Sequence, residues 1–228
     1  MIDAKARISA VILAAGNSTR MGVPKQFLPL QGRPLLAYSL LAFQACDAVH
    51  EIIVVTRRED IEKVQNIAQT QNITKLTHVV VGGNSRKESA RCGVQVCDST
   101  SEYVAIHDGA RPLVTPTIIK RVVATAIEHG AAAAAVPTKD TIKQVDRNGF
   151  VIKTPPRETL WNVQTPQIFE RELYFKAMQH SEKIKEEITD DCQMVELSGY
   201  AVKLVEGSYS NIKITTPEDI IIAEGWLQ

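Results

Sequence analysis

The sequence predicts an α/β fold: a Rossmann-like, mostly parallel sheet with helices on both faces. Short apolar runs alternate along the chain with amphipathic stretches, which is the pattern of strands connected by helices. The apolar runs are nearly continuous, as expected for strands that are covered on both faces of a parallel sheet. The 228 residues suit one domain over the whole chain, 1–228, because no repeat or linker divides them.

In the first half of the chain the expected strands and helices alternate strictly. Each apolar run is followed by a helical pattern that can return the chain to the start of the next parallel strand. The expected strands cover residues 8–13, 51–56, 77–81, 103–107 and 131–136, and the expected helices begin at Pro34 or cover residues 60–71, 85–96 and 115–129.

Residues 138–157 break this alternation and predict a hairpin. Two alternating stretches flank Asn148-Gly149, and Asn-Gly is a strong signal for a hairpin turn. An isolated two-stranded hairpin is marginally stable in water, so this one is expected to dock on something. The residues themselves leave two interpretations open: an extension of the edge of the main sheet, or an arm that embraces a second subunit.

The last third of the chain combines further strands and helices. After residues 161–166 it is expected to contain a helix at 171–180, a shorter helix after Asp191, and strands at 201–205 and 211–214. The final helix has a clear start, because Thr216 suits the N-cap position and Pro217 the first helical position.

Composition excludes several classes of protein. Lys plus Arg equals Asp plus Glu at 26 each, so the chain lacks the basic surplus of a duplex-binding protein and must meet any anion with local cations. The four cysteines show no metal-binding spacing and are expected to be reduced thiols. No apolar run is long enough to span a membrane. We therefore expect a protein of the bacterial cytoplasm or, in mature form, of the plastid stroma.

The loop after the first strand has the composition of a phosphate site. Ala14, Ala15 and Gly16 have small side chains that let a ligand approach the backbone, and Arg20 and Lys25 place two cations in the same loop. The loop matches neither the Walker pattern nor the dinucleotide pattern G-x-G-x-x-G. Backbone amides with two cations suit a triphosphate.

Asp108 ends the fourth expected strand, where a carboxylate can hold Mg²⁺ together with phosphate oxygens. The glycine loop, the Gly82-Gly83 turn and Asp108 all fall at the carboxyl edge of the sheet, where ligands bind in such folds. His107 is expected to be a packed core residue. Because no Ser/His/Asp or Cys/His set is present, direct transfer of a phosphoryl-type group is favoured over covalent catalysis.

The ordered motifs resemble those of a known family. From residue 8 to about residue 224 the chain is similar to the 2-C-methyl-D-erythritol 4-phosphate cytidylyltransferases, sugar-phosphate nucleotidyltransferases of the non-mevalonate isoprenoid pathway. The motifs that carry the resemblance are Leu13-Ala14-Ala15-Gly16, Arg20-Met21-Gly22, Pro24-Lys25-Gln26-Phe27, Gly82-Gly83-x-x-Arg86-x-x-Ser89, His107-Asp108-Gly109-Ala110-Arg111-Pro112, Asp140-Thr141-Ile142-Lys143, Gln164-Thr165-Pro166-Gln167, Thr189-Asp190-Asp191 and Asn211-Ile212-Lys213-Ile214-Thr215.

The resemblance implies in-line attack of a sugar-alcohol phosphate on the α-phosphorus of CTP, with release of pyrophosphate. It implies a homodimer with exchanged arms, which favours the arm interpretation of the hairpin. It also implies residue roles. CTP would be bound by Ala14, Ala15, Gly16, Gly83 and Ser89, and Mg²⁺ by Asp108. Arg20, Lys25, Lys213 and Arg157 would be the catalytic residues, and the first three would neutralise charge on the triphosphate and on the transition state. The acceptor would be bound by Thr141 and Arg157 of the partner's arm together with Arg111, Thr165 and Thr189.

The chain departs from the family pattern at two places. Cys192-Gln193 stand where the family often has Ala-Ser, beside the expected acceptor pocket, and Gly109 stands where Ala is common. Two other functions remain: a ribitol-5-phosphate cytidylyltransferase, and an inactive nucleotide-binding regulatory subunit. The Ala14-Ala15-Gly16 loop disfavours the first, and the retention of every charged site residue disfavours the second.

Overall fold

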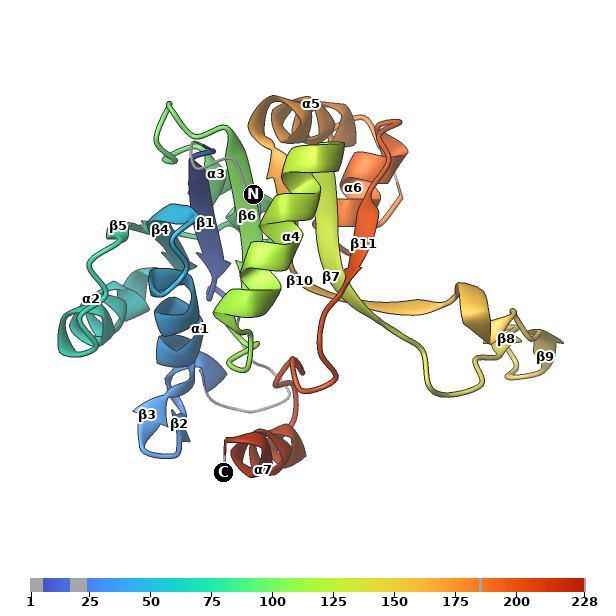
Figure 1. The fold of residues 1–228 in the computed structure, drawn as a ribbon. Helices are drawn as coiled ribbons and strands as arrows, with labels where there is room; N and C mark the ends of the chain where they lie inside the picture. Colours follow the sequence, from blue (N-terminus) through green and yellow to red (C-terminus); the bar gives the residue numbers. More distant parts are fainter. Residues whose placement is uncertain (1–5, 17–23, 185, 228) are drawn as a thin grey trace.

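A mostly parallel sheet runs through the protein in the computed structural model, which describes residues 6–16, 24–184 and 186–227 (Figure 1). Within these residues seven strands form the sheet, and only β10 runs antiparallel to its neighbours. This confirms the predicted fold class. The strands lie in the order β11 (Lys203–Glu206), β7 (Ala131–Pro137), β10 (Trp161–Glu170), β6 (Tyr103–Asp108), β1 (Ile8–Leu13), β4 (Val49–Thr56) and β5 (Leu76–Val81).

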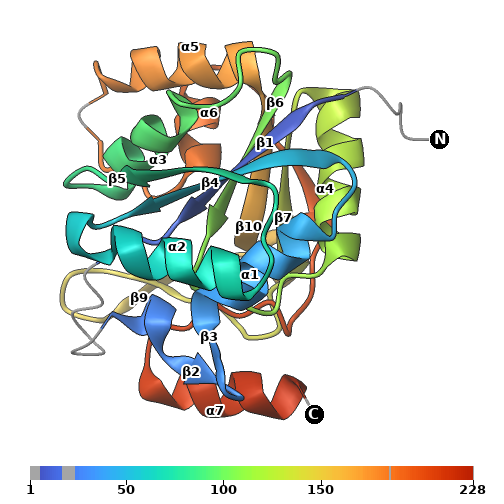
Figure 2. The ribbon, with the colours of Figure 1, turned by 90° about the vertical axis from the view of Figure 1, so that its left-hand side faces the viewer.

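Helices cover both faces of the sheet, as Figure 2 shows for α3, α5 and α6 on one side and α1 and α4 on the other. Alternate side chains of β1 explain this arrangement: Ala10 and Ile12 pack with the helices of one face, and Val11 packs with those of the other. One face carries α1 (Leu35–Gln44), α2 (Ile61–Thr70) and α4 (Pro116–His129), and the other carries α3 (Arg86–Val94), α5 (Arg171–Ser181) and α6 (Asp191–Leu197).

Local signals set the ends of several helices. The Ser85 hydroxyl accepts from the Glu88 N–H at the start of α3, and the Thr115 hydroxyl accepts from the Ile118 N–H at the start of α4. Helix α4 ends at Gly130, whose φ of 81° is in the left-handed region that favours glycine. The last helix, α7 (Pro217–Trp226), lies below the sheet in Figure 1, and Pro217 occupies its first turn as predicted.

The predicted strand at 211–214 is wrong. Its alternating pattern is real, but no strand of the sheet lies beside it among the described residues, and its backbone contacts a loop instead: the Ile214 N–H donates to the Ala110 carbonyl at 2.8 Å. The segment is therefore a loop that contacts the residues just after β6. A short hairpin of β2 (Pro29–Leu30) and β3 (Arg33–Pro34), not expected from the sequence, precedes α1.

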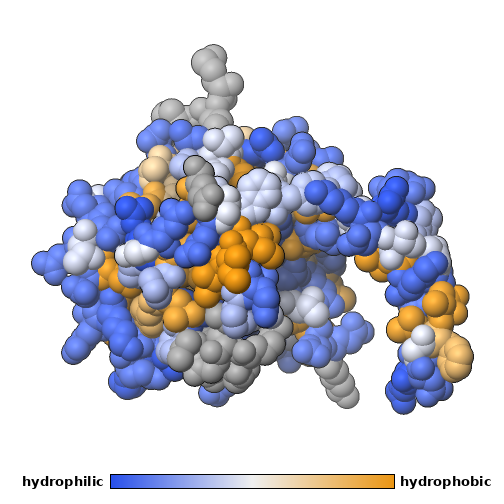
Figure 3. Space-filling model, turned by 90° about the horizontal axis from the view of Figure 1, so that it is seen from below, coloured by the Kyte–Doolittle hydropathy of each residue, from blue (hydrophilic) through white to orange (hydrophobic). Residues whose placement is uncertain are grey.

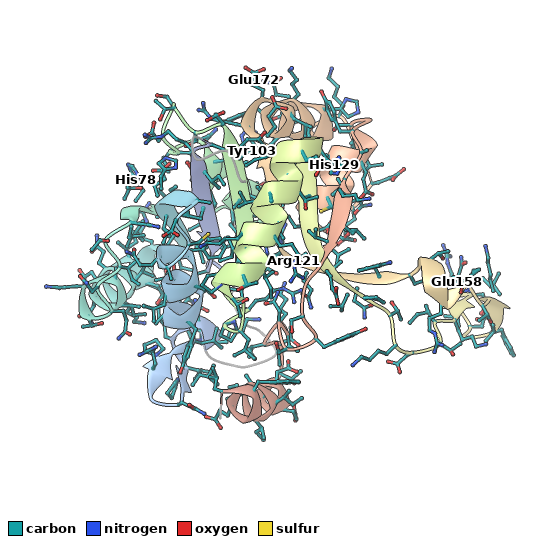
Figure 4. All side chains as sticks on the ribbon, viewed as in Figure 1. His78, Tyr103, Arg121, His129, Glu158 and Glu172 are labelled. Atoms are coloured by element: carbon teal, nitrogen blue, oxygen red, sulfur yellow. The ribbon has the colours of Figure 1, made fainter. Side chains whose placement is uncertain are left out.

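The predicted hairpin is present and projects from the sheet at the right of Figure 1. Its strands β8 (Gln144–Val145) and β9 (Val151–Lys153) pair only with each other in the part of the chain that the structure describes, so the edge-extension interpretation is wrong. At the turn Gly149 has a φ of 86°, and the Asp146 carboxylate accepts from the backbone N–H groups of Asn148 and Phe150. We call residues 138–157 the arm. Figure 4 shows Glu158, just beyond it, well away from the sheet.

The helices of the described residues are all too short or too polar to cross a membrane.

Candidate functional site

A cleft of about 680 Å³ opens at the carboxyl edge of the sheet. The loop after β1, the end of β4, the turn after β5, the start of α3 and the end of β6 line it together with Lys213. The three turns that the sequence placed at this edge therefore meet in one crevice, as predicted. Backbone hydrogen bonds to β4 hold two of them: the Ala14 N–H donates to Val55 O at 2.7 Å, and the Gly82 N–H donates to Thr56 O at 2.9 Å.

The turn after β5 requires glycine because the backbone passes close to its neighbours. A Cβ at Gly82 would lie 2.6 Å from the Cβ of Ala15 and 2.8 Å from Oγ of Ser89. A Cβ at Gly83 would lie 2.4 Å from the Cβ of Glu88. The glycines thus bring the turn against the first loop and against Ser89, whose buried hydroxyl is 3.4 Å from the Gly83 carbonyl. All the predicted CTP-binding residues line this cleft.

Asp108 lies on the floor of the cleft between two cations. Lys213 Nζ is 2.8 Å from its Oδ2, and Arg86 Nε is 3.3 Å from its Oδ1. Burial would raise the pKa of this carboxyl, but Arg86 and Lys213 outweigh burial and hold the pKa well below its usual range. The carboxylate is therefore ionised at every physiological pH.

Lys25 joins the first loop to the segment that carries Lys213. Its Nζ donates to the Ile214 carbonyl at 2.7 Å, and both Lys25 and Lys213 line the cleft. Arg20, the other predicted cation of the loop, lies outside the described residues.

Arg86 is a site residue to which sequence reasoning gave no role. It lines the cleft, and its guanidinium contacts both Asp108 and Asp191. The signal was present in the motif Gly82-Gly83-x-x-Arg86-x-x-Ser89, because residues three apart in the first turn of α3 share one face of the helix. Arg57 and Arg58, at the end of β4, also line the cleft and were not predicted.

Thr165 contacts both the backbone of Asp108 and the side chain of His107. The Thr165 hydroxyl accepts from the Asp108 backbone N–H at 3.0 Å and lies 3.0 Å from Nδ1 of His107. His107 is fully buried and packs against Phe43, which confirms it as a core residue. Burial lowers the pKa of His107 to about 3, so the ring is neutral at physiological pH. Thr165, predicted to bind the acceptor, therefore also holds the backbone of Asp108.

Arg111 and Thr189, two other predicted acceptor residues, do not line the main cleft. Arg111 donates from Nη1 to the Asn211 carbonyl at 2.7 Å, so it holds the segment that leads to Lys213. Thr189 lies at a second hollow of about 470 Å³. Both its N–H and its hydroxyl donate to Oε1 of Gln193 at 2.8 Å. Gln193, one of the residues that depart from the family pattern, thus provides the hydrogen-bond acceptor for Thr189.

Thr141 and Arg157 lie on the arm and do not line the cleft of their own chain. Both are exposed, and Arg157 donates from Nη1 to the Lys139 carbonyl of the arm itself at 3.1 Å. Of the predicted site residues that the structure describes, the main cleft brings together those for CTP, for metal and for charge neutralisation. The acceptor residues Arg111, Thr165 and Thr189 are not part of its lining, and the arm residues lie apart.

The donor set suits a magnesium ion that arrives with a nucleotide. Among the described residues no group of three or more His, Cys, Asp or Glu side chains forms a metal centre. The cleft offers instead the carboxylate of Asp108 among the cations Lys25, Arg86 and Lys213. Mg²⁺ usually keeps several waters and takes one or two carboxylates plus substrate phosphates, so this set fits it.

Comparisons with known proteins all give the same family. Residues 8–228 match the family model for 2-C-methyl-D-erythritol 4-phosphate cytidylyltransferase. The chain is 48% identical over 226 residues to the 2-C-methyl-D-erythritol 4-phosphate cytidylyltransferase of Caldanaerobacter subterraneus subsp. tengcongensis, a match that covers 97% of this chain and 99% of that protein. The protein of the same name from Desulforamulus reducens is 47% identical over 97% of this chain and 96% of its own length.

Solved structures give the same result for the fold. The crystal structure of 4-diphosphocytidyl-2C-methyl-D-erythritol synthase from Anaerococcus prevotii superposes with a TM-score of 0.90 at 34% identity, over 100% of this chain and 98% of that one. The 2-C-methyl-D-erythritol 4-phosphate cytidylyltransferase of Thermus thermophilus superposes with a TM-score of 0.77 at 30% identity, over 96% and 97%.

Proposed function

The chain belongs to the 2-C-methyl-D-erythritol 4-phosphate cytidylyltransferase family, and from this premise we propose that it transfers CMP from CTP to 2-C-methyl-D-erythritol 4-phosphate in the non-mevalonate pathway. The products are 4-diphosphocytidyl-2-C-methyl-D-erythritol and pyrophosphate. One observation carries the proposal: a single cleft joins the small-residue loop after β1, the cations Lys25 and Lys213, and the carboxylate of Asp108.

The cleft suits the recognition of CTP. Its first loop and its Gly82-Gly83 turn present closely spaced backbone, with the Ser89 hydroxyl beside them. Backbone groups that hydrogen-bond the edge of a cytosine reject other bases, because a mismatched base leaves buried polar groups unpaired. We assign this role to Ala14, Ala15, Gly16, Gly83 and Ser89.

The reaction joins two polyanions, so its main demand is charge neutralisation and positioning. A phosphate oxygen of the acceptor attacks the α-phosphorus of CTP in line with the departing pyrophosphate. Lys25, Lys213 and, by resemblance, Arg20 stabilise the charge that develops on the phosphates. Asp108 would hold Mg²⁺, which when bound neutralises phosphate oxygens of CTP.

The acceptor is bound, in this proposal, between two subunits of a homodimer. Thr141 and Arg157 are exposed on the arm and lie apart from the cleft of their own chain, which suits delivery to a partner's cleft. The exposed apolar side chains of the arm support such a contact. Arg111, Thr165 and Thr189 complete the acceptor pocket, and residues 1–228 act as one nucleotidyltransferase domain. Since the relatives are bacterial, we place the enzyme in the cytoplasm of a bacterium.

Pyrophosphate release with CTP and magnesium tests the proposal. Three acceptor conditions are compared: 2-C-methyl-D-erythritol 4-phosphate, ribitol 5-phosphate, and no acceptor. We expect rapid release with the first alone. Preference for ribitol 5-phosphate would overturn the acceptor but keep the chemistry. No release with either acceptor would overturn the assignment of activity and favour a nucleotide-binding regulatory subunit.

A further inference from the structure

A chain of alternating charges leads from the buried interior to the floor of the cleft. Tyr174 of α5 donates from its hydroxyl to Oδ1 of Asp191 at 2.5 Å. Arg86 donates from Nη1 to Oδ2 of the same carboxylate and from Nε to Asp108 at 3.3 Å. Lys213 contacts the other oxygen of Asp108 at 2.8 Å. Asp191 is only 3% exposed and does not line the cleft, and among the described residues it reaches the site through Arg86.

Asp191 is held rigidly at the start of α6. Oε1 of Gln167 accepts from the backbone N–H groups of Asp191 and Cys192, at 3.1 and 3.2 Å. Nε2 of Gln167 donates to the Asp190 carboxylate at 2.8 Å. Gln167 is itself buried on β10, so the sheet determines where the Asp191 carboxylate lies. A carboxylate fixed in this way can orient the guanidinium that contacts it.

The charges of the chain balance only when Asp191 is included. Asp191 and Asp108 are negative, and Arg86 and Lys213 are positive. Burial would lower the pKa of Arg86, but the two carboxylates outweigh burial and raise the pKa above its usual value, so its charge is permanent. Without Asp191, the full charge of Arg86 would be directed at Asp108, and the floor of the cleft would carry one more positive charge. Such a floor repels a divalent cation and attracts a triphosphate.

We propose that Asp191 and Arg86 are positioning residues for Asp108: Asp191 neutralises and orients Arg86, which keeps the Asp108 carboxylate fixed and available to the metal that accompanies CTP. This inference rests on the proposed function. It gives a role to the last residue of Thr189-Asp190-Asp191, which is not part of the cleft wall, and to Tyr174, which is fully buried.

The test is the isosteric variant Asp191→Asn, with CTP affinity measured by calorimetry both in magnesium and in EDTA. The dissociation constant in EDTA divided by the dissociation constant in magnesium gives a ratio that reports the contribution of the metal. We expect the ratio to fall by roughly 10-fold to 100-fold, the usual cost of losing a partner of a metal ligand. Affinity in EDTA should stay the same or increase, because the site gains positive charge.

A merely structural role predicts a different result. General damage to the cleft weakens CTP binding by the same factor in both conditions, and an unchanged ratio overturns the inference. Glu182→Gln is the matched control, because Glu182 forms an exposed ion pair with Arg91, which lies on helix α3 like Arg86. This control should leave both constants unchanged.

Two further results complete the test. If Asp191→Asn does not fold, Tyr174→Phe replaces it, because this variant removes one hydrogen bond to Asp191 and keeps every charge. Tyr174→Phe should also lower the ratio, by a smaller factor. An unchanged ratio overturns the inference. A wild-type protein that binds CTP equally well with and without magnesium overturns the metal role of Asp108 and this inference with it. A wild-type protein that does not bind CTP overturns the proposed function itself.

Discussion

Lys213 Nζ lies 2.8 Å from Oδ2 of Asp108, although the two residues are far apart in the sequence. The contact exists because a backbone hydrogen bond from the Ile214 N–H to the Ala110 carbonyl holds the segment 211–214 against the residues just after β6. It places a cation from the end of the chain beside the carboxylate of a central strand. Lys213 helps to keep that carboxylate ionised, and both side chains line the cleft.

Replacement of Lys213 by Met should lower kcat by about 10²-fold to 10³-fold, the cost of losing one preorganised charge contact to a transition state. Steady-state pyrophosphate release measures it. Lys120→Met is the control, because Lys120 forms an exposed ion pair with Asp47 on the outer surface of α4. Equal activity of the two variants would contradict the role of Lys213.

Asp108→Asn keeps the shape of the side chain and removes its charge. Without that charge, Lys213 and Arg86 are left without their shared carboxylate, so the cleft becomes more positive. We expect CTP to raise the melting temperature of this variant equally with magnesium and with EDTA, whereas the wild type should need magnesium for its full shift. A variant that keeps the magnesium dependence of the wild type would show that Asp108 is not the metal ligand.

Mixed dimers test whether the arm serves the partner's cleft. If arms are exchanged, a heterodimer of Arg157→Gln and Lys213→Met subunits contains one cleft with both native residues and one with neither. Mixing the two inactive variants, after denaturation and refolding together, should therefore restore activity. No recovery would mean that each arm serves its own chain, and activity of Arg157→Gln by itself would mean that Arg157 has no role in the reaction.

The arm surface should determine the oligomeric state. Phe150 is 73% exposed, and Val151 and Ile152 beside it are also exposed; the three form an apolar group near the tip of the arm (Figure 3). Phe150→Asp places a charge in this group, and we expect a dimer to become a monomer in analytical ultracentrifugation. Arg147→Gln, a polar change at the same turn, should leave the dimer intact. If the Phe150→Asp protein is still dimeric, the interface lies elsewhere.

His107 predicts how stability depends on pH. Its folded pKa of about 3 lies below the unfolded value of about 6.5, so the unfolded chain binds the extra proton between these values. Stability from this residue is therefore full above about pH 6.5 and is lost as pH falls toward about 3. Between about pH 7 and about pH 5 the loss should be about 2 kcal/mol. Urea unfolding of the wild type and of His107→Gln checks it: the variant should lose less stability over that range, and parallel losses would contradict the prediction.

The order of strands and helices could be predicted because its signals are local. Residues 8–13, 77–81 and 131–136 are apolar runs whose length and composition suit buried strands, and the structure has strands there. The pattern failed at 211–214, because an alternating stretch becomes a strand only where a neighbouring strand accepts its hydrogen bonds, and the described part of the sheet provides none at that position. The residues of the hairpin left two interpretations open for the same reason: pairing partners are a property of the fold.

The cleft was predictable in outline, since parallel strands place their carboxyl ends at one edge, and Ala14, Gly83 and Asp108 each follow or end such a strand. The partners of these residues were not. Two sets of contacts depend on side chains from distant elements meeting in space: Arg86 with Asp108 and Asp191, and Thr165 with His107 and the Asp108 backbone.

The sequence by itself determined which chemical groups are present and at which edge of the sheet they lie, because strand periodicity and turn composition are local properties. Only the tertiary structure decided which charges neutralise one another, because electrostatic energy depends on distances that the chain sets when it packs.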